Sequence, residues 1–217
     1  AVHDGYNILI LSDRGVSADR MAIPALLACS ATHEHLVKTG LRTSAGLVVD
    51  TGSAREVHHF ALLAGYGAEA VCPWLAFETI KHMDVKDSQE AAKKFVKAIG
   101  KGLYKVMSKM GISTIASYRC AGLFEVIGLN QNIMQLCFPE IPSRIQGADF
   151  SDIEQDNINL ARRAFLPHQK IEHGGLLKYV HGGEYHAFNP NVVSYLQHAV
   201  KTGSYADYRK FADEVNN

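Results

Sequence analysis

Residues 46–71 read GLVVDTGSAREVHHFALLAGYGAEAV and contain a short apolar run, a polar turn, a helical segment and a second apolar run. The first run, residues 45–50, ends at the polar residues 51–53, and a helix is expected from residue 53 or 54 to 63. Glycines at positions 65 and 67 end that helix before the strand expected at 68–71. This strand, helix, strand order is typical of a crossover between two parallel strands.

The same pattern continues on both sides of this segment. Residues 6–12 (YNILILS) predict a strand buried on both faces, and helical spacing follows from residue 23 to Gly40. Asp87 and Glu90 have capping-box spacing before a long helix that ends at Gly111. Residues 112–116 are a fourth candidate strand, and residues 123–137 contain further helix. We therefore predict an α/β fold with about four β/α units, whose parallel sheet resembles part of a (β/α) barrel or a small open sheet.

The alternating pattern stops after about residue 138. Residues 139–170 are polar and irregular, with a helical candidate at 153–164, and are expected to form a connector packed on the sheet. From residue 174 the sequence is glycine-rich and then aromatic. A helix capped by Asn189 is expected over residues 190–200, with Gly203 after it. The C-terminal segment is thus predicted to be irregular and helical.

Composition excludes several classes of protein. Lys plus Arg and Asp plus Glu both number 22, so the zero net charge excludes the basic footprint of a nucleic-acid binder. The cysteines at 29, 72, 120 and 137 are scattered, which favours free thiols in a reducing compartment over a zinc or disulfide framework. No apolar run approaches a membrane span, so we expect a soluble, cytoplasmic chain. Because it begins with Ala1 and not Met, we expect a piece of a longer protein.

Four segments, in this order, resemble the large subunit of bacterial-type glutamate synthase. They are LSDRGVSADRMAIPALLA (residues 11–28), GLVVDTGSAREVHHFALLAGYGAEAV (46–71), MSKMGISTIASYRCAGLFEVIGL (107–129) and GGEYHAFNPNVVSYLQHAVKTG (182–203). The first three resemble the second half of its central domain, and the last resembles the start of its FMN-binding domain. The implied boundaries are residues 1–138 for the central domain, 139–173 for the connector and 174–217 for the start of the FMN-binding domain.

The resemblance implies membership of an oxidoreductase of ammonia assimilation that acts on CH–NH2 donors. Such an enzyme converts glutamine and 2-oxoglutarate into two glutamates, using FMN and an iron-sulfur cluster, with electrons from NADPH or ferredoxin. Its implied partners are the glutaminase and FMN domains and, through the whole enzyme, a small subunit or ferredoxin. This segment carries neither the family's N-terminal cysteine nor its flavin and cluster motifs, so we expect no catalytic, cofactor-binding or metal-binding residue in it. Residues 118–125 (YRCAGLFE) depart from the family pattern, which leaves the role of that turn open.

Nine polar residues are candidates for a polar passage or a domain contact: Asp13, Arg14, Arg55, Glu56, His58, Glu78, Arg144, Glu184 and His186. Each also has a purely structural interpretation. Asp13 and Arg14 follow the first strand, where Arg14 could hold an anion or line an ammonia path, or where both could pair locally. Glu78 follows the third strand and, if buried, requires a cationic partner such as Arg42, Arg55 or Arg144.

The remaining candidates lie at turns. Arg55, Glu56 and His58 lie near a helix start, where Glu56 would complement the helix dipole. Adjacent histidines on a helix point about 100° apart, so His58 and His59 favour packing over a shared metal. Glu184 and His186 lie beside Gly182 and Gly183, in either an interdomain turn or a substrate contact.

Three functions fit these observations. The first is a structural connector of glutamate synthase without catalytic residues of its own. The second is a freestanding, non-catalytic scaffold or interaction module derived from the central domain. The third is a half barrel that binds a small molecule at the carboxyl ends of its strands. Flanking sequence, partner binding and ligand-induced stabilisation would respectively distinguish them.

Overall fold

The computed structural model describes residues 1–167 and 174–216. Within those residues the elements are the 3-10 helices η1 (Val2–Asp4) and η2 (Arg42–Ser44), the strands β1 (Ile8–Ser12), β2 (Gly46–Asp50) and β3 (Ala70–Cys72), and the α-helices α1 (Ala25–Lys38), α2 (Val57–Gly65), α3 (Trp74–His82), α4 (Ser88–Lys109), α5 (Ile115–Tyr118), α6 (Gln131–Cys137), α7 (Phe150–Ala164), α8 (Pro190–Thr202) and α9 (Tyr205–Asn216). No helix among the described residues is long and apolar enough to cross a membrane.

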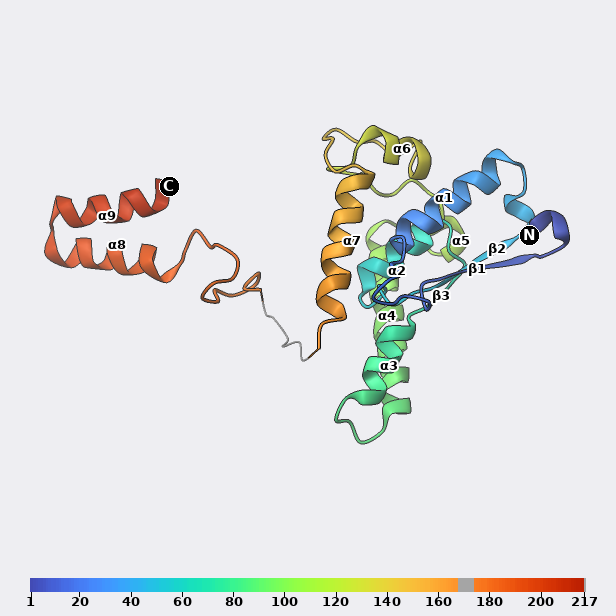
Figure 1. Cartoon of the computed structure of the whole chain (residues 1–217), viewed down its shortest axis with the longest axis horizontal. Coiled ribbons are helices and arrows are strands. Elements are labelled where there is room, and N and C mark those ends of the chain that lie inside the picture. Colours follow the sequence, from blue (N-terminus) through green and yellow to red (C-terminus); the bar gives the residue numbers. More distant parts are fainter. Residues whose placement is uncertain (168–173, 217) are drawn as a thin grey trace. The chain divides into compact units, whose positions relative to one another are not determined.

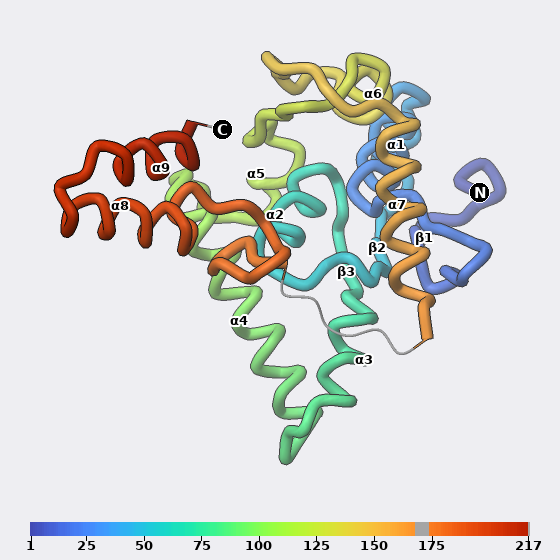
Figure 2. The backbone as a smooth tube through the Cα atoms, turned by 60° about the vertical axis from the view of Figure 1, so that its left-hand side comes forward, coloured from blue at the N-terminus to red at the C-terminus, as the bar shows by residue number. Residues whose placement is uncertain are grey.

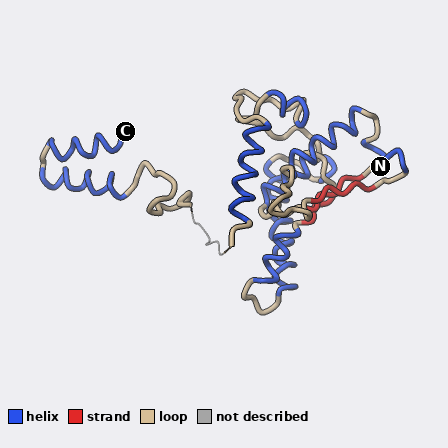
Figure 3. The backbone as a smooth tube through the Cα atoms, viewed as in Figure 1, coloured by secondary structure: helices blue, strands red, loops and turns tan. Residues whose placement is uncertain are grey.

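The three strands form one parallel sheet in the order β1-β2-β3 (Figures 1 and 3). Ile8 pairs with Gly46 and Ser12 with Asp50, while Asp50 in turn pairs with Cys72. Helix α1 connects β1 to β2, and α2 connects β2 to β3. The predicted α/β fold with parallel crossovers is therefore confirmed, but the sheet has three strands and does not form a barrel.

The core lies on one side of this sheet, where α1, α2 and α4 pack. Val49 of β2 is 1% exposed and contacts a buried cluster from α1 and α2. Phe95 and Ile99 of α4 pack against the same cluster, and Phe95 makes an edge-to-face contact with Phe60 at 6.4 Å between ring centroids. Burying Val49 and its neighbours stabilises the unit by roughly 1.5–3 kcal/mol per large apolar side chain.

No described element of the first unit covers the opposite face of the sheet, so the prediction that the first strand is buried on both faces is wrong. Ile8 and Ile10 point to that face and are 61% and 64% exposed. Strands in sequence order with crossovers of one hand place every connecting helix on the same side. Side chains of even number in β1 therefore receive no cover from α1 or α2.

The fourth predicted strand, residues 112–116, is also wrong. Gly111 adopts a positive φ of 69°, and the chain then turns into the short helix α5. Thr114 caps that helix, accepting a hydrogen bond from the Ser117 N–H at 3.4 Å. Tyr118 at its end is 1% exposed and packs with Ala61 and Met107 between α2 and α4. Burial of this ring fixes the segment under the helices, where it has no strand partner.

Most predicted helices are confirmed, with shifted ends. Asp87 caps α4 by accepting from the N–H groups of Gln89 and Glu90 at 2.9 and 3.0 Å. The expected helix at 153–164 is α7, which begins at Phe150, and the helix after residue 53 is α2, which begins only at Val57. Helices α3 and α9 had no counterpart in the prediction. Helices α3 and α4 lie side by side and project away from the sheet (Figures 1 and 2).

The described chain divides into two compact units, residues 1–166 and 167–217. Helix α7, in the predicted connector, belongs to the first unit, where Ile153 packs against the buried Ile133 cluster of α6. Residues 168–173 of that connector lie outside the described residues. In the second unit α8 and α9 form a helical hairpin around Gly203, whose φ is 66°. Asn189 caps α8 as predicted, through the N–H groups of Asn191 and Val192.

Candidate functional site

The carboxyl ends of the three strands bring together the densest polar cluster of the first unit. Parallel strands all end at the same edge, so residues that follow them converge although they are distant in sequence. Asp13 follows β1, Thr51 follows β2, and Trp74 begins α3 just after β3. We call this group of residues, together with Arg14 and Asp50, the strand-end cluster.

Asp13 holds the three strand ends together. Its Oδ2 accepts a hydrogen bond from Thr51 Oγ1 at 2.5 Å, and its Oδ1 accepts one from Trp74 Nε1 at 2.5 Å. The N–H of Gly52 donates to both oxygens at 3.0 Å. Each carboxylate oxygen therefore has at least two donors from neighbouring segments. This saturation makes Asp13 a tether between loops and not a free base.

Asp50 forms the second carboxylate of the cluster. Ser12 Oγ and Arg14 Nε both donate to its Oδ2, at 2.8 and 2.7 Å. Burial alone would raise the pKa of Asp50, but hydrogen bonds from Arg14, Ser12 and Cys72 outweigh it and hold the pKa below its usual range. Asp50 is thus ionised at neutral pH. Its Oδ1 is buried and has no hydrogen-bond partner among the described residues.

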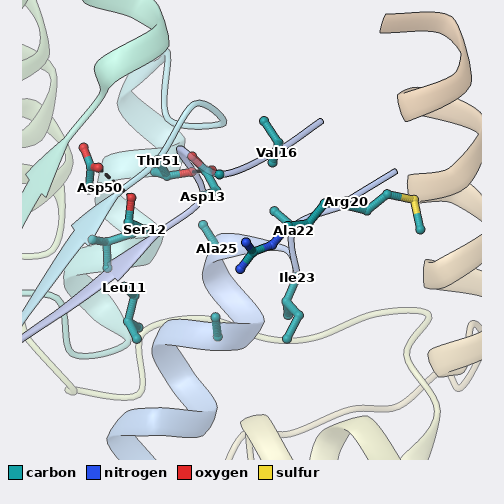
Figure 4. A pocket seen from close by; sticks show the side chains of 14 residues that line it. Leu11, Ser12, Asp13, Val16, Arg20, Ala22, Ile23, Ala25, Asp50 and Thr51 are labelled. Carbon is teal, nitrogen blue, oxygen red and sulfur yellow. Dashed lines mark hydrogen bonds between the residues drawn. The ribbon is translucent and has the colours of Figure 1, made fainter. Parts of the chain in front are cut away.

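A cavity of about 300 Å³ lies beside this cluster (Figure 4). Its wall is mainly apolar, with Leu11 and Val49 from the strands and Ile23 from the segment before α1. Ser12 and Asp50 supply polar groups, and Figure 4 shows the hydrogen bond between them. The cavity is at the lower end of the size range, about 300–1,000 Å³, of small-molecule sites.

Arg14 and Glu78, two of the predicted site residues, lie on the outer side of the cluster. The Arg14 guanidinium lies 5.4 Å from the Trp74 ring centroid, and both residues line a groove with Glu78. Glu78 would have needed an arginine partner if it were buried, but its side chain is 42% exposed and pairs with Lys81 at 2.5 Å. One turn of α3 separates these two residues, so the pair forms within the helix and needs no distant partner.

The polar residues before and within α2 do not join the cluster. Glu56 pairs with His59, with 3.3 Å between Oε1 and Nε2, and the Arg55 N–H donates to His59 Nδ1 at 3.3 Å. His58 makes an edge contact with Phe124, with ring centroids 6.3 Å apart. The two histidines therefore have different neighbours. Among the described residues no group of three or more His, Cys, Asp or Glu side chains is placed to hold a metal ion.

The other predicted residues lie elsewhere. Arg144 is exposed in the connection between α6 and α7. Glu184 and His186 belong to the second unit, where the Glu184 N–H donates to the Gly174 carbonyl at 2.7 Å and His186 Nε2 contacts the Gly175 carbonyl. These contacts close a turn before α8. The structure therefore brings together only Asp13, Arg14 and, at its margin, Glu78.

The sequence interpretation missed three members of the cluster: Asp50, Thr51 and Trp74. Each of them lies at or directly after the end of a strand, which is the same signal that selected Asp13 and Arg14. Applying that rule to all three strands would have found them. What the cluster does chemically is to occupy its carboxylates with fixed donors, and so to hold the strand ends at set positions.

Comparison with known proteins gives a consistent result. The family profile described as the glutamate synthase central domain matches residues 1–130. The chain is similar to the NADPH glutamate synthase large chain of Bacillus subtilis (strain 168), with 41% identity over 225 aligned residues that cover 99% of this chain and 15% of the relative. The ferredoxin-dependent glutamate synthase of Pyropia yezoensis is 37% identical over 236 residues, covering 100% of this chain and 15% of the relative. The NADH glutamate synthase of Schizosaccharomyces pombe is 39% identical over 224 residues, covering 98% and 11%. The chain thus spans 11–15% of the length of these relatives.

Proposed function

The chain belongs to the glutamate synthase central-domain family, and from this membership we propose that it is a non-catalytic connector within a glutamate synthase large chain. The whole enzyme would be an oxidoreductase that converts glutamine and 2-oxoglutarate into two glutamates. We assign residues 1–138 to the central domain, 139–173 to a connector, and 174–217 to the start of the FMN-binding domain. We expect the enzyme in the cytoplasm.

The observation that carries this proposal is the one-sided sheet. Parallel sheets are normally covered on both faces, because a βαβ crossover buries one face and further elements bury the other. Here Ile8 and Ile10 remain 61% and 64% exposed on the uncovered face. Strands in sequence order, with helices on a single side, are the arrangement of an arc of a (β/α) barrel. We therefore propose that further β/α units of a large chain cover this face.

The strand-end cluster supports a structural role. Both Asp13 oxygens and Asp50 Oδ2 accept hydrogen bonds from fixed donors, and Asp50 Oδ1 is buried, so the hydrogen bonds of the cluster mainly link the strand ends to one another. Holding three strand ends in register would fix the loops that contact neighbouring domains. We propose this positioning as the contribution of Asp13 and Arg14 to a domain contact or polar passage.

The cofactors expected of the whole enzyme do not fit the described residues. An iron-sulfur cluster needs three or four convergent cysteines, whereas Cys29 and Cys137 are buried in different helices, and no ligand group of three exists in the described part of the chain. The phosphate of FMN favours backbone N–H groups and cations. At the strand-end edge the Arg14 cation is instead paired with Asp50, and the Gly52 N–H is occupied by Asp13. We therefore assign FMN and the cluster to other parts of the large chain.

The partners proposed for this segment follow from the same reasoning. The glutaminase and FMN domains of the large chain would be its direct neighbours. A small subunit or ferredoxin would reach it only through the whole enzyme, and the relatives themselves differ in being named for NADPH, NADH or ferredoxin.

A chimera of the Bacillus subtilis large chain tests the connector role. The aligned segment would be replaced by this chain, and glutamine-dependent glutamate formation measured. We expect activity to be retained in the chimera and reduced when Ile10→Lys is added. The matched control is Leu160→Lys, which places the same charge on a residue of α7 that is 62% exposed. Equal effects of the two substitutions would contradict a covered sheet face.

The isolated chain gives a complementary measurement. After incubation with FMN, or with iron and sulfide, and removal of excess reagent, the protein should show no visible absorption bands. Bound flavin or cluster bands would overturn the assignment. The freestanding scaffold remains the alternative, because an uncovered apolar face also suits an interaction module. An inactive chimera, together with tight binding of the isolated chain to a separate synthase subunit, would favour it.

A further inference from the structure

The solvent-facing side of α4 is strongly basic, although the chain as a whole is neutral. The helix carries six lysines and a single acidic residue, Glu90. Five of the lysines recur at every fourth position and form one ridge about 24 Å long: Lys93, Lys97, Lys101, Lys105 and Lys109. All five are exposed, and none has an ion-pair partner in the part of the chain that the structure describes. Like charges at this spacing destabilise an isolated helix.

A second ridge, which is not charged, runs beside the lysines. Val96, Gly100 and Tyr104 are also four residues apart, and the side chains of Val96 and Tyr104 are 55% and 72% exposed. A methyl group added at Gly100 would have no atom within 4 Å, so nothing in this unit requires a glycine there. Glycine is among the least favourable residues inside a helix. Its neighbour Gly102 differs, because there the added carbon would lie 2.2 Å from Val57 Cγ2.

Solvation alone accounts poorly for this pattern. A helix face that only meets water is best served by mixed charges and strong helix formers. This face instead combines charges of one sign, a glycine with open space above it, and exposed apolar side chains on either side of that glycine. Together they form an apolar row with open space at Gly100, bordered on one side by cations. We call residues 93–109 of this face the α4 ridge pair.

We propose that the α4 ridge pair docks an acidic amphipathic helix of a separate partner protein. Rows of residues four apart are the ridges that interdigitate in the commonest packing of two helices. A partner side chain would lie over Gly100 between Val96 and Tyr104, while carboxylates on the partner would face the lysine ridge. This surface goes beyond the connector role and does not depend on it.

The chemistry favours a separate protein over a permanent domain contact or a nucleic acid. Only two large apolar side chains, Val96 and Tyr104, are exposed in the apolar row, and obligate interfaces are larger and more apolar. Surface lysines mainly accelerate association and set specificity, as suits a reversible complex. Nucleic acid would use the charges but not the apolar ridge, and the zero net charge of the chain argues against it.

Fluorescence anisotropy with a labelled synthetic peptide tests the proposal. The peptide would be a helix with leucines on one face and glutamates flanking them, and the control peptide would have the same composition in scrambled order. We expect the 217-residue chain to bind the first peptide at least about tenfold more tightly than the second, with affinity falling as salt rises. Equal binding of the two peptides, or tighter binding of a short DNA duplex, would overturn the proposal.

Variants locate the binding to this face. Lys97→Glu combined with Lys101→Glu should weaken peptide binding about tenfold. The same change in net charge made by Lys178→Glu with Lys201→Glu, in the second unit, should leave binding within about twofold. Tyr104→Ala, at an exposed position that the fold does not use, should weaken binding about fivefold and provides a test if the double charge reversal does not fold. Equal loss from both charge reversals, or no loss from Tyr104→Ala, would refute this docking mode.

Discussion

Two glycines in α4, Gly100 and Gly102, allow the packing of α4 on α2 to be measured by a matched pair of substitutions. Replacing either by alanine gains about 0.5–1 kcal/mol of helix stability, since glycine is the poorer helix former. At Gly100 the added methyl group meets no atom within 4 Å. At Gly102 it would lie 2.2 Å from Val57 Cγ2 and 2.8 Å from Cγ1. Valine has one strongly preferred rotamer in a helix, so the two helices must separate.

Taking the difference between the two substitutions cancels the helix-propensity gain and leaves the cost of overpacking, about 1–3 kcal/mol. Gly100→Ala should raise the free energy of unfolding. The free energy of unfolding of the Gly102→Ala variant should be about 1–3 kcal/mol lower than that of the Gly100→Ala variant. In a unit of this size each kcal/mol corresponds to about 2–4 °C in Tm. The assay is urea unfolding followed by Trp74 fluorescence, which reports only on the first unit because the chain has one tryptophan.

Val57→Ala provides the rescue, because it removes both methyl groups that the new carbon would meet. In that background Gly102→Ala should lose most of its penalty relative to Gly100→Ala, with only the Cβ of residue 57 left at 3.1 Å, giving a positive coupling in a double-mutant cycle. If the two glycine substitutions shift the unfolding midpoint equally in the unaltered chain, α4 does not approach α2 as described.

Three further predictions concern the site and the sheet. Asp13→Ala should lower the free energy of unfolding by about 2–4 kcal/mol, because it leaves the Trp74 and Gly52 N–H groups without partners; Asp19→Asn is the exposed control, expected within about 0.5 kcal/mol in the same urea assay. The lowered pKa of Asp50 means that its ionised form stabilises the fold above the ordinary carboxyl pKa, and this contribution is lost as pH falls below about 4. The difference in urea midpoint between the unaltered chain and the Asp50→Asn variant should therefore become smaller on acidification. A difference that stays constant with pH would contradict this prediction. Ile10→Lys in the isolated chain should change stability by no more than about 0.5 kcal/mol, whereas a Leu47→Ala substitution at a fully buried position should cost about 2–5 kcal/mol; similar losses would mean that the sheet face is covered.

Local sequence signals were sufficient to predict an element where its own residues determine its secondary structure. Capping residues, turn residues and hydrophobic periodicity predicted the strands β1 and β2. They also predicted the capped starts of α4 at Asp87 and of α8 at Asn189. These features depend on backbone conformation and hydrogen bonds within a few residues. Tertiary packing does not have to be known to find them.

The prediction failed where packing against the rest of the fold determines the conformation or the burial of a segment. Residues 112–116 contain β-branched side chains in a strand-like pattern, but burial of Tyr118 between α2 and α4 draws the segment under the helices. β-propensity largely reflects packing against a neighbouring strand, and none is available there. The burial of β1 was overestimated for a related reason. An apolar run does not reveal whether one or both faces will be covered.

The sequence predicted two of the five members of the strand-end cluster. Asp13 and Arg14 stood out because they follow a strand directly in the sequence. Their main partners, Asp50, Thr51 and Trp74, lie 36 to 61 positions further along the sequence. Only the alignment of three parallel strands brings those residues together. The strand-end rule can therefore name the members of such a cluster, but the register that links them comes from the sheet.

The order of the strands also governs how the chain can fold while it is being synthesised. Ile8 pairs with Gly46, and Val48 pairs with Ala70. Each strand can therefore pair as soon as the next strand of the sequence has left the ribosome. The N-terminal unit can thus grow by addition at one edge, in the order of translation. Neither crossover covers Ile8 and Ile10, so until another segment does, they form an exposed apolar surface of the kind that favours aggregation of incompletely folded chains. Successful folding therefore depends on how soon that surface is covered during synthesis, and not only on the stability of the final fold.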